Sequence, residues 1–236
     1  MSDKKDREQF SRVAESNKEY RPSISDRAVA MWEILSVTSS FLIAAWLVVP
    51  FAANARWLIV VPVGLALGFI FVSHRARRET AREIGWRLDN FTEAARLLAV
   101  PMLAFACLIV LSVWLLGSLR TGKALGWQWA LWLPVWGLAQ QYVLQGFINR
   151  RAQVVCGGRN FRSVLCVAVI FTLLHAPNLW LMLATFAGGY VWAVVYQRAP
   201  NLLALGLSHS LMSLLLASAV PATTLNSLRI GFRFFG

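Results

Sequence analysis

Three glutamines and two histidines interrupt apolar stretches of this chain, and they are the side chains best suited to chemistry. Gln140, Gln141 and Gln145 share one stretch, whereas His175 and His209 lie in two later ones. Polar groups at membrane depth cost free energy unless they find partners or serve a function. An amide can orient a water molecule or donate to an oxyanion, and a neutral imidazole can accept a proton. These five side chains are the candidate site.

The composition places these residues in a membrane. Of the 236 residues 58% are hydrophobic and the mean hydropathy is +0.57, which is outside the range of soluble domains. The formal charge of +12 could suggest nucleic-acid binding, but the basic residues lie in short loops between apolar runs, where they set membrane topology. Cys107, Cys156 and Cys166 have no metal-like spacing and predict neither a disulfide framework nor a metal site.

The apolar runs predict an all-α, multi-pass membrane helix bundle. Residues 1–30 are polar and are interpreted as a cytosolic tail, with Ser25 and Asp26 as the N-cap of the first membrane helix. The membrane domain is expected over 31–236. Because a span needs roughly 20 mostly apolar residues, about seven transmembrane helices are predicted, at 31–53, 57–73, 96–117, 126–148, 163–177, 179–197 and 201–220.

The basic residues predict the orientation of this bundle. Alternate sides of the predicted helices hold 18 and 5 Lys and Arg residues, which places the N-terminus in the cytosol and the C-terminus outside. Tryptophans flank the helices and are interpreted as an aromatic belt at the membrane surface, namely Trp57, Trp127, Trp129 and Trp192. His74 is interpreted as a residue that reaches toward the interface, without a functional role.

The five polar side chains are expected to lie at similar depth. With a helical rise of 1.5 Å per residue, Gln140 and Gln141 lie about 14–15 Å from the nearest cytosolic charge, His209 about 17 Å and His175 about 20 Å. These depths are near the middle of a hydrocarbon core roughly 30 Å thick. Each residue could instead be structural, since a glutamine also joins helix pairs. Ser213, one turn after His209, shares its helix face and can hydrogen-bond to it.

The order of these residues resembles the CAAX-protease and bacteriocin-processing (CPBP, or Abi) family of intramembrane proteases, whose motifs are Glu-Glu-x-x-x-Arg, Phe-x-x-x-His and His-x-x-x-Asn. Gln140-Gln141-Tyr142-Val143-Leu144-Gln145 occupies the first, Phe171-Thr172-Leu173-Leu174-His175 fits the second, and His209-Ser210-Leu211-Met212-Ser213 fits the third. The resemblance covers about 126–216. It implies that the first Glu is a general base for water, that the histidines position the water or stabilise the oxyanion, and that the Asn assists.

This chain departs from that pattern at the catalytic positions. Gln140 stands where the base would be, Gln141 and Gln145 replace the second Glu and the Arg, and Ser213 replaces the Asn. Glutamine has no basic site for a proton, and Glu93 is the last acidic residue of the chain. No cofactor is expected, because two histidines without a carboxylate or thiolate make a poor zinc site.

Two functions therefore remain open, and a small transporter or channel is a third class that no broken-helix repeat supports. One is an endopeptidase that cleaves a membrane-proximal or lipidated peptide, with His175 or His209 as base and Gln140 or Gln141 holding the oxyanion. The other is a pseudoprotease that binds or escorts a membrane partner. Either would act in a bilayer, on a lipidated or membrane-associated peptide or protein and not on nucleic acid. The resemblance suggests the inner membrane of a bacterium.

Overall fold

The computed structural model describes residues 22–49, 55–115 and 127–236, and these are helical with no strand among them. Most of the predicted tail, 1–21, therefore lies outside the described residues. The elements follow one another as α2 (Ile24–Ile43) continued by η1 (Ala44–Val48), η2 (Arg56–Ile59), α4 (Val60–Ala76), α5 (Ala81–Ile84), α6 (Phe91–Leu115), α7 (Trp127–Gln141), η3 (Tyr142–Asn149), α8 (Arg150–Cys156), α9 (Phe161–Leu173), α10 (Leu179–Arg198), α11 (Leu202–Ala219), η4 (Asn226–Leu228) and η5 (Gly231–Phe235).

The multi-pass helical architecture is confirmed, with one refinement in the number of spans. Five described helices are long and apolar enough to cross a membrane, namely Ile24–Val48, Trp57–Ala76, Phe91–Leu115, Leu179–Arg198 and Leu202–Ala219. The other two predicted segments are also helical but do not reach this standard. The segment around the glutamines is divided between α7, η3 and α8, and α9 has only 13 residues.

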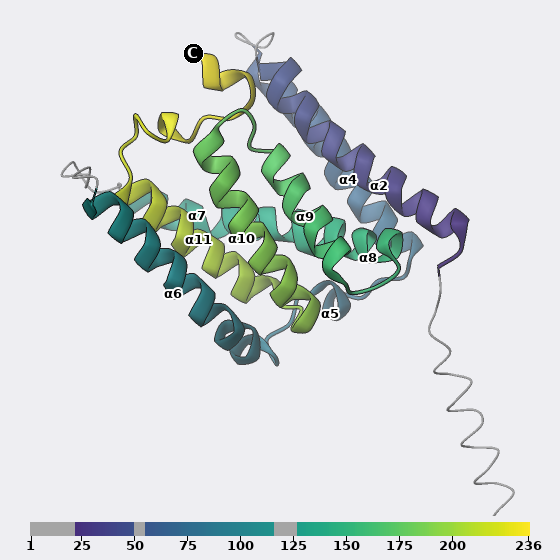
Figure 1. Ribbon diagram of the computed structural model, residues 1–236. Coiled ribbons are helices and arrows are strands. Elements are labelled where there is room, and N and C mark those ends of the chain that lie inside the picture. Colours follow the sequence, from purple (N-terminus) through teal and green to yellow (C-terminus); the bar gives the residue numbers. More distant parts are fainter. Residues whose placement is uncertain (1–21, 50–54, 116–126) are drawn as a thin grey trace, which may run out of the picture.

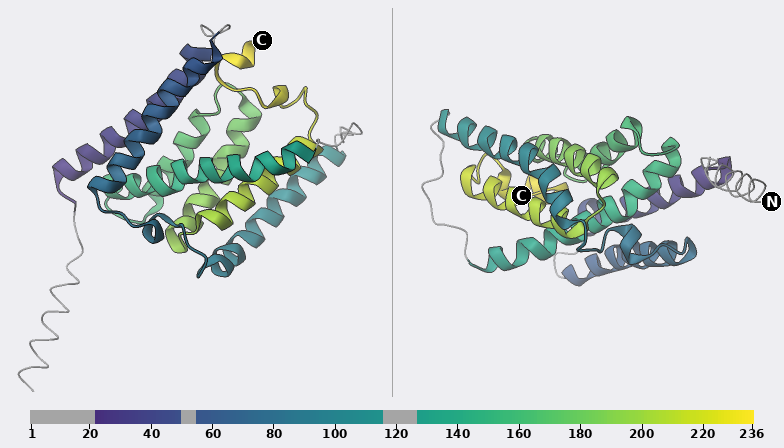
Figure 2. Two further views of the ribbon diagram at one scale, coloured as in Figure 1. Left: turned by 180° about the vertical axis from the view of Figure 1, so that it is seen from behind. Right: turned by 90° about the horizontal axis from the view of Figure 1, so that it is seen from below.

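The helices form two groups joined by a central pair (Figures 1 and 2). The α2–α4 hairpin lies on one side and packs through α2 against α8, whereas α6 lies on the other side and packs against α11. Between them α9 packs against α10, and α7 crosses the bundle and packs against α11. Gln140 and Gln141 are the last residues of α7, and Gln145 lies in η3, which follows it.

The first membrane helix starts earlier than the sequence predicts. Ser23 is its N-cap and forms a capping box with Asp26, so that the helix begins at Ile24 and not near residue 31. Ser25 and Asp26, which were expected to cap the helix, lie inside its first turn. The polar residues just before Ala30 are therefore part of the helix.

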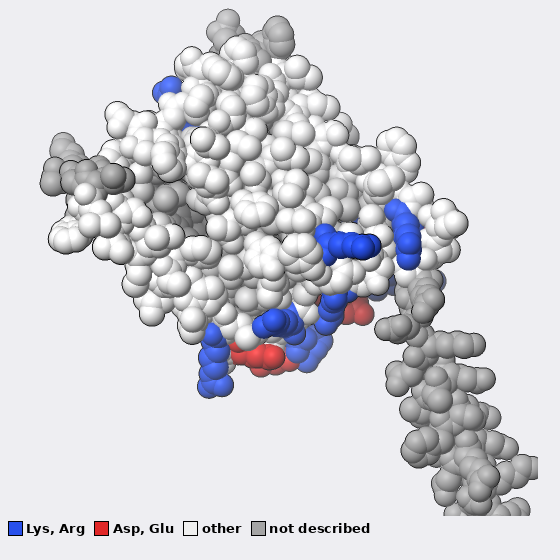
Figure 3. Space-filling model, viewed as in Figure 1, with Lys and Arg blue, Asp and Glu red and all other residues white. Residues whose placement is uncertain are grey.

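The charged side chains gather at one end of the bundle. Figure 3 shows them below α10 and α5, while most of the remaining face has no charged side chain. Basic residues lie in and after the last turn of α4, as at Arg75 and Arg78, and between α8 and the first turn of α9, as at Arg159 and Arg162. This one-sided distribution agrees with the charge asymmetry from which the cytosolic side is predicted.

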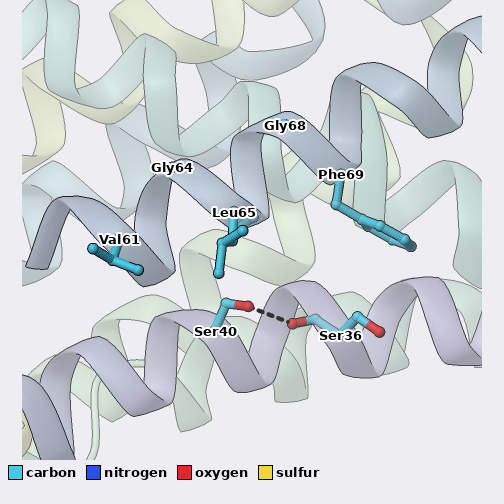
Figure 4. Close-up of a pocket in the computed structure, with 8 residues that line it drawn as sticks. Ser36, Ser40, Val61, Gly64, Leu65, Gly68 and Phe69 are labelled. Carbon is cyan, nitrogen blue, oxygen red and sulfur yellow. Dashed lines mark hydrogen bonds between the residues drawn. The ribbon is translucent and has the colours of Figure 1, made fainter.

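A groove between α2 and α4 faces away from the bundle (Figure 4). Its volume is about 660 Å³, and it is lined by Ser36 and Ser40 of α2 and by Gly64, Leu65 and Gly68 of α4, among others. Leu65 is 67% exposed, which fits a lipid-facing surface. The Ser40 hydroxyl is satisfied within α2, because it donates to the carbonyl of Ser36. None of the lining residues is ionisable, so this groove is not a catalytic site.

Candidate active site at the Gln/His cluster

Two glycines allow α7 and α11 to approach closely and thereby position the candidate site. A Cβ atom on Gly137 would lie 2.4 Å from the hydroxyl of Ser210 and 2.8 Å from the carbonyl of Gly206. A Cβ atom on Gly206 would lie 2.9 Å from Cα of Leu138. Real side chains do not tolerate such distances, so the two backbones can touch only because both positions are glycine. Gly137 and Gly206 each lie about one turn before a site residue.

Beyond this contact, Gln141 of α7 meets His209 of α11. The Gln141 Nε2 amide donates to His209 Nδ1 at 3.0 Å. Gln141 is fully buried and His209 is 7% exposed. Because an amide nitrogen can only donate, Nδ1 is the accepting nitrogen of the neutral imidazole and Nε2 carries its proton. His209 is thus arranged as a hydrogen-bond donor through Nε2.

Phe171 connects the two histidines. Its ring centroid lies 4.7 Å from that of His175 and 5.8 Å from that of His209, in edge-to-face geometry in both cases. His175 Nδ1 donates to the Phe171 carbonyl at 2.8 Å, because a carbonyl can only accept. The second nitrogen of a neutral His175 therefore keeps its lone pair. His175 is the histidine arranged as a proton acceptor, and His209 is the one arranged as a donor.

The segment after Gln141 is wound as a π-helix from Tyr142 to Asn149, with its Gln145 side chain fully buried. Wider turns of this kind are frequent at functional sites. Three amide atoms of the predicted site are buried without a hydrogen-bond partner, namely Gln140 Oε1, Gln141 Oε1 and Gln145 Nε2. Buried polar atoms in this state require an explanation. These three atoms are two acceptors and one donor, and they belong to residues within two helical turns of one another.

The acidic residues of the first half of the chain do not supply the missing base. Glu33 of α2 binds Arg77 at 2.7 Å and Arg151 at 2.9 Å, and the hydroxyl of Ser73 also donates to it. Glu79, in the loop after α4, accepts hydrogen bonds from the guanidinium groups of Arg151 and Arg150, each at 2.8 Å. Both carboxylates are therefore neutralised by arginines at the charged end of the bundle.

These ion pairs also affect the proton affinity of Glu79. Burial by itself would raise the pKa of Glu79, but hydrogen bonds from His74 and Arg151 and the charges of Arg151 and Arg150 hold it well below its usual range. A carboxylate with a depressed pKa is a weak proton acceptor. Glu79 is consequently a structural counter-ion and not a general base.

Several sequence-based assignments need correction. Trp192 does not belong to a surface belt: it is 4% exposed and stacks on His209 with centroids 4.5 Å apart. Its indole NH donates to Ser208 at 2.9 Å. His74 does not reach toward the interface, since it is 5% exposed and its Nδ1 pairs with Glu79. The side chains of Trp127 and Trp129 lie outside the described part.

One expectation about the site itself also changes. His175 does not lie on a helix, because α9 ends at Leu173 and His175 belongs to the following turn. His209 is also paired with a residue of another helix, because its Nδ1 accepts from Gln141. One sequence signal for Trp192 is Gly188, which lies one helical turn before it; a Cβ atom on Gly188 would lie 2.9 Å from the Trp192 ring.

The described residues offer a poor metal site. No group of three or more His, Cys, Asp or Glu side chains lies close enough together in the ranges that the structure covers. The three cysteines are free, and Cys107 is exposed rather than packed in a core. His175 and His209 would therefore have only carbonyl and amide groups as neighbours for a divalent ion, a donor set that zinc does not favour.

A comparison with protein-family models matches part of the chain. The model described as "Type II CAAX prenyl endopeptidase Rce1-like" matches residues 122–215, a region that contains α7 to most of α11 and every residue of the Gln/His cluster. Comparisons with curated proteins and with solved structures give no match. The resemblance seen in the three motifs is thus confirmed over residues 122–215, which are similar to the Rce1-like type II CAAX prenyl endopeptidases.

Proposed function

We propose that this protein is a CAAX-protease-like membrane protein that binds a membrane-proximal or lipidated peptide at the Gln/His cluster without glutamate-dependent hydrolysis. The observation that carries this proposal is the set of three unpartnered amide atoms on Gln140, Gln141 and Gln145. Polar atoms buried at this depth are costly unless a ligand satisfies them. A peptide group supplies both a donor and an acceptor, and it is the chemical group that the family recognises.

The chemistry of the cluster favours binding over cleavage. Attack of water on a peptide bond needs a base to take its proton, and a positioned base contributes about 10²–10⁴-fold to the rate. The glutamines cannot take this proton, and Glu33 and Glu79 are neutralised by arginines. In this function the protein sequesters or escorts its partner, in the inner membrane of a bacterium.

A second function, endopeptidase activity, is favoured by one observation. His175 Nδ1 is engaged with the Phe171 carbonyl, so that Nε2 of the neutral ring is free to accept a proton. In this case His175 would be the base, and His209, which donates through Nε2, would stabilise the oxyanion together with an amide of the glutamines.

The two functions are separated by profiling the N-terminal peptides of membranes from cells that express the wild type, His175→Ala or His209→Ala at equal abundance. Binding without cleavage predicts identical profiles. Termini present only with the wild type would instead establish endopeptidase activity and identify the substrate. A variant that restores the family pattern, Gln140→Glu with Gln141→Glu, Gln145→Arg and Ser213→Asn, serves as the positive control for substrate expression.

A further inference from the structure

The amide of Gln145 belongs to a buried network that extends away from the site. Asn149 lies at its centre, fully buried, one turn after Gln145. Asn149 Nδ2 donates to Gln145 Oε1 at 2.7 Å and to the Ala193 carbonyl at 3.4 Å. Asn149 Oδ1 accepts from the amides of Gln197 at 2.9 Å and Gln153 at 3.0 Å. Both atoms of the Asn149 amide are thus occupied.

Two backbone carbonyls fix the direction of this network. The Ala193 carbonyl can only accept, so it must face the Nδ2 group of Asn149. The Ser163 hydroxyl donates to the Asn160 carbonyl at 2.8 Å, so it must accept from Gln197 Nε2, at 3.0 Å. Gln197 Nε2 is consequently also the atom that faces Asn149 Oδ1. Both carbonyls therefore require the same orientation of the Asn149 amide, with Nδ2 toward Ala193 and Oδ1 toward Gln197.

This orientation determines what Gln145 offers to a ligand. Because Asn149 Nδ2 occupies Gln145 Oε1, Gln145 is left with Nε2, a buried donor without an acceptor. Gln140 and Gln141 offer the opposite polarity, an unpartnered Oε1 each. All three groups are uncharged. A free carboxylate would place its oxygens beside two acceptors, whereas a carboxamide or an internal peptide group supplies the matching N–H and C=O groups.

We propose that Asn149 is a positioning residue that fixes the Gln145 amide with its donor free, and that the site is thereby specific for an uncharged peptide group over a free C-terminal carboxylate. This inference rests on the proposed peptide-binding function and specifies its ligand. Asn149→Asp tests it, because an aspartate at this position can only accept. Gln145 would then rotate its amide to donate to Asp, and would offer Oε1 to the ligand in place of Nε2.

The binding experiment uses the full chain in lipid nanodiscs and two probes. Each probe is the same diazirine-bearing palmitoyl chain, ending either in a primary carboxamide or in a free carboxylate, so that neither probe contains a second amide group. The wild type should capture the carboxamide probe about tenfold more than the carboxylate probe, with the crosslink within 140–149. Asn149→Asp should lower capture of the carboxamide probe about tenfold. Asn226→Asp makes the same chemical change at an amide that donates to the Phe234 carbonyl, outside the network, and should have no effect.

Three outcomes would overturn the inference. Equal capture of both probes by the wild type removes the selectivity, and unchanged capture by Asn149→Asp removes the positioning role. If the wild type captures neither probe, peptide binding itself is wrong. The orientation is then decided by the side-chain amide signal of Gln145 in selectively ¹⁵N-labelled protein, assigned through its loss in Gln145→Met. If this signal does not shift in Asn149→Asp, Asn149 does not fix the orientation of the Gln145 amide, whatever the probes show.

Discussion

Gln141 and His209 form a polar pair that a low-dielectric environment makes sensitive to the loss of either partner. Truncating Gln141 to Leu leaves His209 Nδ1 buried without a donor, and leaving a buried polar group unsatisfied costs free energy. Hydrogen bonds between membrane helices are worth about 0.6–2 kcal/mol. We therefore expect Gln141→Leu to lower the free energy of unfolding by about 1–2 kcal/mol, measured by reversible denaturation in mixed micelles.

The control for this prediction is the double variant Gln141→Leu with His209→Leu. Replacing both partners removes the unsatisfied atom, so the double variant should be more stable than the sum of the two single changes implies. Additive effects would mean that the 3.0 Å contact between the amide and the imidazole contributes nothing to the folded state.

At the scale of helices, the α7–α11 contact depends on glycine. Gly206→Val would place its side chain against the backbone of Leu138, and such overpacking typically costs about 1–3 kcal/mol. We expect this loss in the free energy of unfolding, together with separation of Gln141 from His209. Gly64→Val is the matched control in another membrane helix, because a Cβ on Gly64 meets no atom within 4 Å. Equal destabilisation by the two variants would contradict close packing at Gly206.

The sequence predicted the helices better than their ends. Hydropathy and length located every long apolar helix, because a bilayer leaves few alternatives to helical structure. The end of α9 at Leu173 was missed by four residues, although Pro177 explains it: a proline lacks the N–H that would bond to the carbonyl four residues earlier, and its ring collides with that carbonyl. The π-helix at Tyr142–Asn149 has no comparable signal, since it depends on how its side chains pack against neighbouring helices.

The candidate site residues stay predictions, whereas the contacts among them could not be predicted. Polar side chains stand out in apolar stretches of a sequence. Gln141, His175 and His209 could therefore be selected as candidates from their polarity and their expected depth in the membrane. Pairing of Gln141 with His209 depends on the rotation of α7 and α11 about their axes, which the glycines set. The stacking of Trp192 on His209 is likewise a consequence of helix packing. Resemblance supplied the order of the motifs but not this geometry.

At the scale of the whole molecule, one ionic cluster connects the α2–α4 hairpin with residues 122–215, the region that the family model matches. Glu33 and Ser73 come from α2 and α4, Glu79 from the loop after α4, and Arg151 from α8. Arg151 is 1% exposed and contacts all three. The sequence showed only a charged loop and two consecutive arginines, and we read neither as a contact across the molecule. The cluster explains why α2 packs on α8.

The protonation of Glu79 should therefore control how firmly this hairpin is attached. Because its folded-state pKa lies below the ordinary value of 4.5, folding favours the ionised carboxylate. The stabilisation is complete above pH 4.5 and is lost as the pH falls below it toward the depressed folded value. We expect the melting temperature of the wild type to fall between pH 6 and pH 3.5. The melting temperature of Glu79→Gln should be lower than that of the wild type at pH 6 and should change less over this pH range.

The control is Glu93→Gln, which alters an exposed carboxyl and should keep the pH dependence of the wild-type melting temperature. If Glu79→Gln retains the full decrease, the Arg150–Arg151–Glu79 contacts do not fasten the hairpin, and the acid sensitivity arises elsewhere.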